Sequence, residues 1–480
     1  MQRNARAPLR TVAVAGDGPT GLAAAIALRR ALPRCEVIVI STPADPAALA
    51  DHAITSTPQS NGFLSRIGIG EGGLVVRAGA SHRVAVELVG WTGPQSRSLH
   101  PYGAAPPEGA AAPAVAAALA AEGRFAHPSD DPASPLSDID YALRINPPAY
   151  RRHLAALAAQ IGIVSRRAGL SAAVPDAEGG IAHLRLADGE ILAADLFVDC
   201  SGPAALVARA LPGACAAGAE VDWSRILPCD RLLLPAAPRP PCLTPLDRVT
   251  ATEFGWRSEV HGRDGTHVVF AAHSAAGSPE AWARAAGFDP AQIVTIRPGQ
   301  RTRIWQANVV CIGDAAVRLE PLHWLNQALA HSQIALLLEL LPGCDSDPLE
   351  IAEFNRRAAA MADRARDYVA LHYCAPQRPS GPFWAHAASL ERPESLQRTL
   401  GEFARRGRLP FFEEDFMPRE AWIFAMASIG QQPAPTPRSL ALSEEQRIAL
   451  ADAQQARAQS AVRIAPPYAE WLASYLRGLQ

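Results

Sequence analysis

The 480-residue sequence contains no lysine, so all 45 of its basic residues are arginine. A coding bias that also enriches alanine and proline is the simplest origin of this absence. It nevertheless excludes every catalytic step that needs a lysine amine, because an arginine guanidinium stays protonated in proteins. Charge of either sign is not in excess, since the formal net charge is only -2. The sequence therefore has no general attraction to nucleic acid or to an anionic membrane.

Cysteine pairs and long apolar runs are also missing. The eight cysteines have no C-x-x-C spacing, and several lie in apolar segments as buried thiols do. This pattern argues against a structural zinc site and favours a reducing, cytoplasmic environment, and we expect no metal. No uninterrupted apolar stretch reaches the roughly 18 residues of a membrane span. The first ten residues, MQRNARAPLR, lack the apolar segment of a signal peptide.

What the sequence does contain, near its start, is a strand, a glycine-rich turn and a helix. An apolar run at residues 11–15 is followed by G-D-G-P-T-G and then by a helical pattern. Gly16 permits a tight turn, Gly18 lets the backbone approach a pyrophosphate, and Gly21 lets the helix pack on the strand. This context predicts a nucleotide-binding unit.

One element of that nucleotide-binding pattern differs from the usual one. A second strand is expected at residues 36–40, and such strands commonly end in an acidic residue that binds ribose hydroxyls. Here the strand is followed by Ser41, with Asp45 four residues further on. Either Ser41 binds the ribose more weakly or Asp45 reaches back to it.

A second strand, turn and helix unit occupies residues 308–332. A β-branched run at residues 309–312 predicts a buried strand. Gly313 and Asp314 form the turn, and an apolar helical pattern follows. A helix start offers free N–H groups and a carboxylate accepts hydrogen bonds from hydroxyls, so this unit suits a polar cofactor. A plain structural turn is the alternative.

These patterns predict an α/β fold. Its nucleotide-binding domain would comprise residues 1–215 and 296–345, with a surface excursion at about residues 101–138. A mainly β substrate layer is expected at residues 216–295, and a helical C-terminal region at residues 346–480. A further glycine loop at residues 67–73, I-G-I-G-E-G-G, is either a flexible turn or a close approach to a flat ring through Gly70 and Glu71.

In their order along the chain, these segments resemble those of the flavin-dependent tryptophan halogenases. The resemblance is carried by GDGPTG, IGIGEGG, LAADLFVDCSG, WQANVVCIG, LEPL, RDYVALHY and PFW. It implies an FAD-binding fold of the aromatic hydroxylase type. It also implies that a separate flavin reductase supplies reduced FAD, that the substrate is a small aromatic or carrier-bound group, and that a homodimer is possible.

The sequence departs from the family where the family's chemistry takes place. Halogenases of this family pass oxidised halide to a lysine, and Arg83 stands in that position. The family glutamate that assists the substrate is replaced by His323, which is either a general base or a hydrogen-bonded interior histidine. The Ser-Thr-Gly halide segment becomes Trp324, Leu325 and Asn326. Leu325, Asn326, Gly313 and Asp314 instead resemble the flavin contacts of the hydroxylases.

Three functions follow from the sequence. The first is an FAD-dependent oxidoreductase that uses O₂ to oxidise an aromatic or indole-like group, and the oxidation we expect is hydroxylation. The second is a halogenase with an altered relay residue. The third is a flavin-binding protein without turnover. The absent lysine argues against the second function, and the missing ribose acid leaves room for the third.

Overall fold

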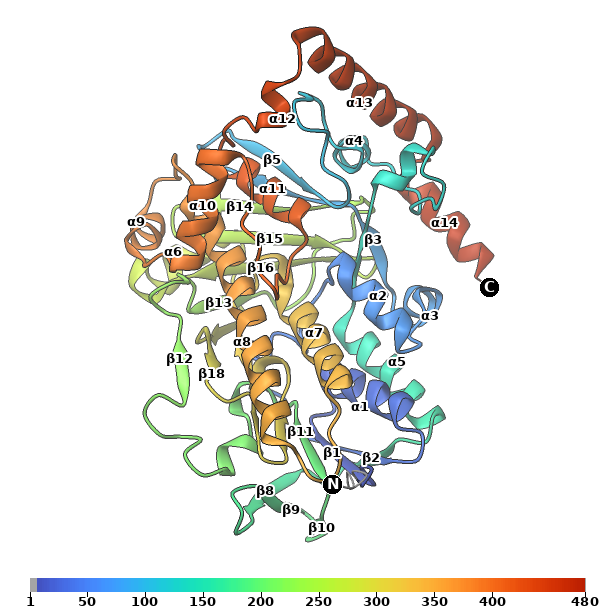
Figure 1. Ribbon diagram of the computed structural model, residues 1–480, viewed down its shortest axis with the longest axis vertical. Coiled ribbons are helices and arrows are strands. Elements are labelled where there is room, and N and C mark those ends of the chain that lie inside the picture. The colour runs from blue at the N-terminus through green and yellow to red at the C-terminus, as the bar shows by residue number, and fades with distance from the viewer. Residues whose placement is uncertain (1–6, 480) are drawn as a thin grey trace, which may run out of the picture. The chain divides into compact units, whose positions relative to one another are not determined.

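The computed structural model describes residues 7–479, which divide into two compact units. Of the described residues, the first unit comprises 7–78, 146–224 and 296–363, and the second comprises 79–145, 225–295 and 364–479. Each unit is therefore assembled from three separate stretches of the chain (Figure 1).

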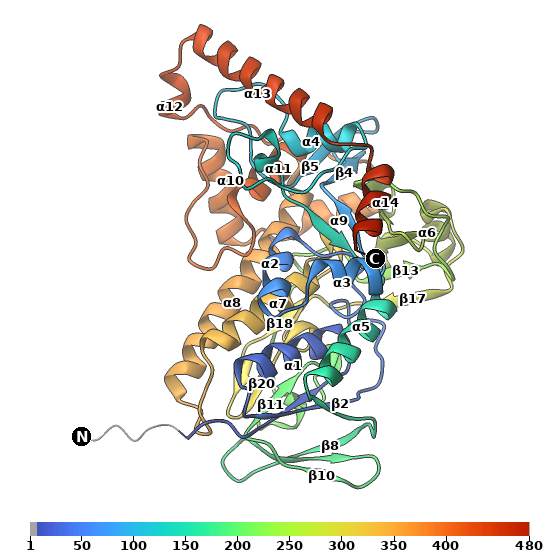
Figure 2. The same cartoon turned by 90° about the vertical axis from the view of Figure 1, so that its right-hand side faces the viewer.

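The first unit is built on a six-stranded sheet with the order β19-β20-β11-β1-β2-β7. All neighbouring pairs are parallel except the edge pair β19 and β20. The strands of the unit are β1 Thr11–Ala15, β2 Glu36–Ile40, β7 Val164–Arg166, β8 Leu170–Pro175, β9 Ile181–Leu186, β10 Ile191–Leu192, β11 Leu196–Asp199, β12 Glu220–Asp222, β18 Gly299–Arg301, β19 Trp305–Gln306, β20 Val309–Cys311 and β21 Val317–Arg318. Strands β8 to β10 form a separate small sheet (Figure 2), as do β12, β18 and β21.

The central strands of this sheet are apolar over most of their length because helices cover the sheet. Val12 to Ala15 in β1 are buried, and so is all of β11. Residues of β1 pair directly with both neighbours, as Val14 does with Val39 and Val198. The helices of the unit are α1 Pro19–Ala31, α2 Pro58–Arg66, α3 Glu71–Arg77, α5 Pro147–Gln160, α7 Leu325–Glu339 and the first part of α8 Pro348–Leu371.

The second unit is built on a seven-stranded sheet with the order β17-β13-β16-β15-β14-β4-β5. Its pairs are antiparallel except β14 with β4. The strands of the unit are β3 Ser81–Arg83, β4 Ala85–Val89, β5 Arg97–Pro101, β6 Ala142–Arg144, β13 Arg231–Leu234, β14 Leu246–Thr252, β15 Gly255–His261, β16 Thr266–Ala272 and β17 Gln292–Thr295. Its helices, besides the end of α8, are α4 Val115–Ala121, α6 Pro279–Ala286, α9 Pro382–Ser389, α10 Glu394–Arg406, α11 Arg419–Ser428, α12 Pro437–Leu440, α13 Glu444–Ile464 and α14 Tyr468–Gly478.

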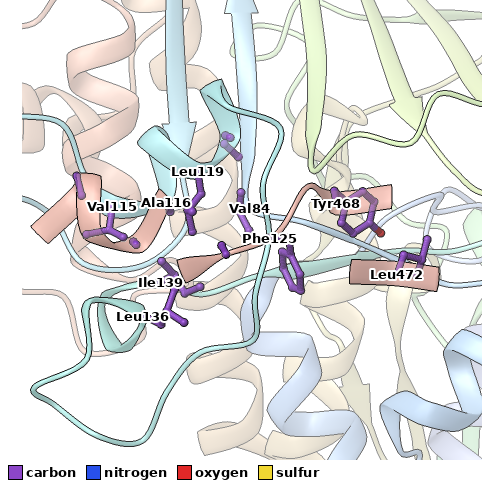
Figure 3. Packing of buried hydrophobic residues seen from close by; sticks show 14 residues of the cluster. Val84, Val115, Ala116, Leu119, Phe125, Leu136, Ile139, Tyr468 and Leu472 are labelled. Atoms are coloured by element: carbon purple, nitrogen blue, oxygen red, sulfur yellow. The ribbon is translucent and has the colours of Figure 1, made fainter. Parts of the chain in front are cut away.

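The contacts in the structure group the chain differently from the sequence expectation. Residues 79–145 were expected in the nucleotide-binding domain but belong to the second unit, because β4 pairs with β14 over five residues. Within them, residues 101–138 combine exposed loops with a packed helix. Helix α4 packs against α13, and Val115, Leu119 and Phe125 are buried in one core with Tyr468 and Leu472 of α14 (Figure 3). The weak periodicity of this alanine- and proline-rich stretch concealed a packed element.

No helix within residues 7–479 combines the length and the apolar character that crossing a membrane requires.

Candidate functional site

The first glycine turn follows β1 and opens α1. Its glycines are required by close packing: a Cβ on Gly16 would lie 2.4 Å from the carbonyl oxygen of Cys200, and one on Gly21 would lie 2.0 Å from that of Gly16. Helix α1 begins at Pro19. Its N-cap residue is Gly18, so no N-cap side chain bonds to the free N–H groups of the first turn. The turn therefore brings the start of α1 against the carboxyl ends of β1 and β11, as the sequence predicts for a nucleotide-binding turn.

Ser41 directly follows β2, where the sequence predicts a contact with ribose, and its side chain has a partner. Its hydroxyl donates a hydrogen bond of 2.9 Å to Asp17, the second residue of the glycine motif. Asp17 is also bonded to Arg151 of α5 at 2.5 Å. An acidic group thus stands beside the end of β2 after all. Asp17 gives no signal in the sequence, because it occupies a variable position of the motif.

Asp314 lies in the 3₁₀ helix Gly313–Ala315 that follows β20. The side chain is buried, and one carboxylate oxygen accepts a hydrogen bond of 2.6 Å from the backbone N–H of Ala50. Burial raises the pKa of Asp314 to about 7, and the Ala50 N–H only partly opposes the rise. A buried carboxyl with this pKa can accept or donate a hydrogen bond at neutral pH.

The segment that leads into α7 has an unusual backbone. His323 and Trp324 both have positive φ, at 61° and 56°, which is costly for residues with a Cβ. No side chain caps the start of α7 at Leu325. His323 is buried. The strained turn therefore fixes an imidazole in the interior, next to the uncapped N-terminus of α7. Strain of this kind occurs mainly where the surrounding structure enforces it for a functional reason.

Side chains at the start of α7 carry polar atoms that no described residue satisfies. They are the Asn326 Oδ1, Gln327 Oε1 and Trp324 Nε1 atoms, all buried. The Asn326 amide nitrogen is used, since it donates to the carbonyl of Leu319 at 2.9 Å. Buried polar atoms normally have partners, so these atoms fit a polar ligand. Together with the glycine turns and Asp314, they fit a flavin dinucleotide.

Gly70 and Glu71 lie at the start of α3, not in a loop. No protein atom lies within 4 Å of the position of a Cβ on Gly70, so close packing does not require this glycine. Glu71 is half-buried in the first turn of α3. The predicted role of both residues at a flat ring stays a prediction.

Arg83 belongs to the second unit, on β3. Its guanidinium lies 3.1 Å from the carboxylate of Asp247, and Arg144 of β6 lies 2.8 Å from the other oxygen of the same carboxylate. All three side chains are almost fully buried. Burial opposes ionisation of Asp247, but Arg144 and Arg83 outweigh it and hold the pKa of this carboxyl below its usual value. Two arginine side chains therefore share one carboxylate, and Asp247 holds the Arg83 guanidinium in place.

Comparison with known proteins shows related sequences and a shared fold. The chain is 26% identical over 436 residues to tryptophan 6-halogenase ThaL of Streptomyces albogriseolus, which covers 81% of each chain. Among solved structures, the flavin-dependent halogenase BrvH of Brevundimonas sp. BAL3 has a TM-score of 0.85 and 26% identity, covering 97% of this chain and 99% of its own. The flavin-dependent halogenase Xcc4156 of Xanthomonas campestris has a TM-score of 0.86 and 25% identity, covering 98% of both chains.

The sequence pattern of the family described as tryptophan halogenase matches residues 11–445. That range includes both glycine turns, Asp314 and the strained turn before α7. The chain belongs to the tryptophan halogenase family.

Proposed function

We propose that this member of the flavin-dependent halogenase family oxidises an aromatic, indole-like group, free or bound to a carrier, by adding oxygen to it. Enzymes of the family use FAD that a separate flavin reductase supplies in reduced form. In the proposed reaction one atom of O₂ enters a C–H bond of the substrate and the other leaves as water, with two electrons taken from reduced FAD.

The residues that would hold FAD are those of the first unit. The turn at Gly16 and Gly18 and the start of α1 suit the pyrophosphate. Asp17 and Ser41 suit the ribose, because their hydrogen bond holds the Asp17 carboxylate beside Ser41, which directly follows β2. Asp314 suits the hydroxyls of the ribityl chain, and the uncapped start of α7 suits the ring.

The observation that carries the choice of oxygen over halogen is the ion pair of Arg83. A lysine relay works because its amine can lose a proton and bond to an oxidised halogen. The guanidinium of Arg83 stays protonated, and it is held by Asp247 at 3.1 Å in the interior. No other residue can supply the amine, since the chain has no lysine. Arg83 can donate hydrogen bonds, but it cannot form a haloamine.

An aromatic cluster in the second unit supports an aromatic substrate. We define this cluster by seven rings: His82, Phe125, His127, Tyr141, Tyr468, Trp471 and Tyr475. Trp471 packs closely within it, with ring centroids 4.4 Å from Phe125, 4.7 Å from His82 and 4.9 Å from His127.

The rings of the aromatic cluster differ in exposure. Its inner members are buried, whereas four rings remain half-buried: His127, Tyr141, Trp471 and Tyr475. Ring faces that are packed on one side and open on the other suit stacking or edge contacts with another flat ring. Helix α14 supplies Trp471 and Tyr475, which are stacked at 4.9 Å.

His323 is the candidate proton acceptor. A buried imidazole held by a strained turn suits removal of a proton from a phenol or an indole N–H as oxygen is transferred. Gln in its place could keep a hydrogen bond but could not take the proton.

One assay separates the proposed reaction from halogenation. The protein is supplied with FAD, a flavin reductase, NADH, O₂, bromide and a panel of indoles, and the products are analysed by mass spectrometry. We expect an added oxygen and no added bromine, and the same result for Arg83→Lys, because the halide segment is altered as well. Bromination by the wild-type protein would contradict the proposal, and release of peroxide alone would indicate a flavin-binding protein without turnover.

A further inference from the structure

A short segment of the first unit lies against all three turns at the carboxyl ends of its central strands. This segment, residues 48–51, follows β2. A Cβ on Gly202, after β11, would lie 3.0 Å from the Ala48 side chain, and one on Gly313, after β20, would lie 3.6 Å from the Ala50 side chain. The Ala50 N–H is bonded to Asp314. The segment is therefore held on the face that we assign to the cofactor.

Asp51, at the end of this segment, reaches the first turn of α1. One oxygen of its carboxylate accepts a hydrogen bond of 2.8 Å from the backbone N–H of Thr20. A Cβ on Gly18 would lie only 2.1 Å from the other carboxylate oxygen. The glycine turn and the start of α1 together form the usual seat of a dinucleotide phosphate. In this chain a side-chain carboxylate occupies that seat.

The surroundings of Asp51 disfavour its charge. Burial raises the pKa of this carboxyl, the Thr20 N–H opposes the rise, and of the charged neighbours His52 lowers the pKa whereas Asp17 raises it. Asp51 is half-buried, whereas the neighbouring carboxyl of Asp314 is buried, and Asp51 contributes to the raised pKa of Asp314. Adding the two negative charges of a pyrophosphate to this group of acids would be costly while Asp51 stays in place.

We propose that Asp51 is a built-in competitor for the cofactor: its carboxylate stands in for an FAD phosphate and must leave the start of α1 before FAD binds. Asp51 thereby lowers the affinity for FAD and favours a cofactor that is taken up and released with each reductase cycle. This proposal rests on the use of FAD but not on which atom is added to the substrate.

The proposal is tested by FAD binding to the full-length protein, followed by the change in flavin fluorescence. Asp51→Asn keeps the shape and removes the charge, and Asp51→Ala also removes the competing oxygen. We expect the dissociation constant for FAD to fall in the order wild type, Asn, Ala, by about tenfold or more in Asp51→Ala, the size of one charge-assisted hydrogen bond. Asp176→Asn is the matched control, because Asp176 also accepts backbone N–H bonds at 2.8 Å, in the turn between β8 and β9.

Two further probes locate the effect on the phosphates. ADP carries the pyrophosphate without the flavin, and riboflavin carries the flavin without a phosphate. Asp51→Ala should strengthen ADP binding as it does FAD binding and leave riboflavin binding unchanged. Weaker or unchanged FAD binding in both variants would overturn the proposal, and so would an equal gain for riboflavin. Because these are binding measurements, they remain valid if the product turns out to be halogenated.

Discussion

The guanidinium of Arg83 lies 3.1 Å from the carboxylate of Asp247, and both side chains are 2% exposed. An ion pair this deeply buried is a structural element as well as a candidate site. The ring of Tyr102 also packs against this ion pair, with its centroid 5.4 Å from the Arg83 guanidinium. Any role of Arg83 in the reaction is therefore that of a fixed hydrogen-bond donor.

Arg83→Gln should lower the free energy of unfolding by about 3 kcal/mol, because removing one partner of a buried pair leaves the other poorly compensated. Arg144 still faces Asp247, so the loss should not exceed that value by much. Urea unfolding monitored by circular dichroism measures it. In contrast, Arg225→Gln removes an exposed arginine from its pair with Glu391 and should change stability by less than about 0.5 kcal/mol. Equal effects of the two changes would refute the structural role of the Arg83 pair.

Asp314 should make the ligand-free protein less stable as the pH rises. Its pKa is about 7 in the folded protein and near 3.8 in an unfolded chain. Between these values the folded protein keeps a proton that the unfolded chain has released, so stability falls by about 1.4 kcal/mol per pH unit through this window. Above the pKa of Asp314 in the folded protein, about 7, the free energy of unfolding no longer falls because of this group.

Asp314→Asn removes this titration. Urea unfolding at several pH values between about 4 and 8 should show the variant gaining stability over the wild type as the pH rises. A constant difference between the two proteins across that range would show that Asp314 is ionised in the fold.

Trp471→Ala should impair the use of an indole substrate without affecting FAD. Loss of a large aromatic contact is expected to lower kcat/KM by about tenfold or more, since about 1.4 kcal/mol corresponds to a factor of ten. The measurement is steady-state kinetics together with an FAD titration. Phe411→Ala is the control, because Phe411 is 86% exposed and lies outside the aromatic cluster. An unchanged kcat/KM would show that the aromatic cluster does not bind the substrate.

His323→Gln should lower kcat by about a hundredfold, the lower end of the range for a lost general base, while FAD affinity is retained. His183→Gln, a half-buried histidine of β9 in the same unit, should be neutral. Single-turnover rates with pre-reduced FAD separate chemistry from cofactor binding. If kcat of His323→Gln stays within about twofold of wild type, His323 only packs the turn.

The parts of the site that depend on neighbouring residues in the sequence could be predicted from it. The strand, glycine turn and helix around Gly16 and the turn at Asp314 are local patterns with a fixed physical purpose, and the structure has both. The substrate-side role assigned to Arg83 stays a prediction. Its partner Asp247 is 164 residues away, and no spacing rule links the two.

Asp51 and the stretch around α4 show where sequence reasoning fails. Asp51 lies between short turns without periodicity, and only the folded chain shows it bonded to Thr20. The stretch around α4 is alanine-rich and lacks an amphipathic pattern, yet Val115 and Leu119 are fully buried against α13 and α14. Long-range packing determines both, so neither leaves a local signal.

The central claim is tested most directly with ¹⁸O₂. The wild-type protein, FAD, a flavin reductase, NADH, an indole substrate and bromide are incubated under ¹⁸O₂, and the product is analysed by mass spectrometry. We predict a product with one ¹⁸O atom bonded to a ring carbon and no bromine, because the relay position holds Arg83, whose guanidinium is fixed and cannot carry an oxidised halogen. A brominated product without ¹⁸O would contradict this prediction.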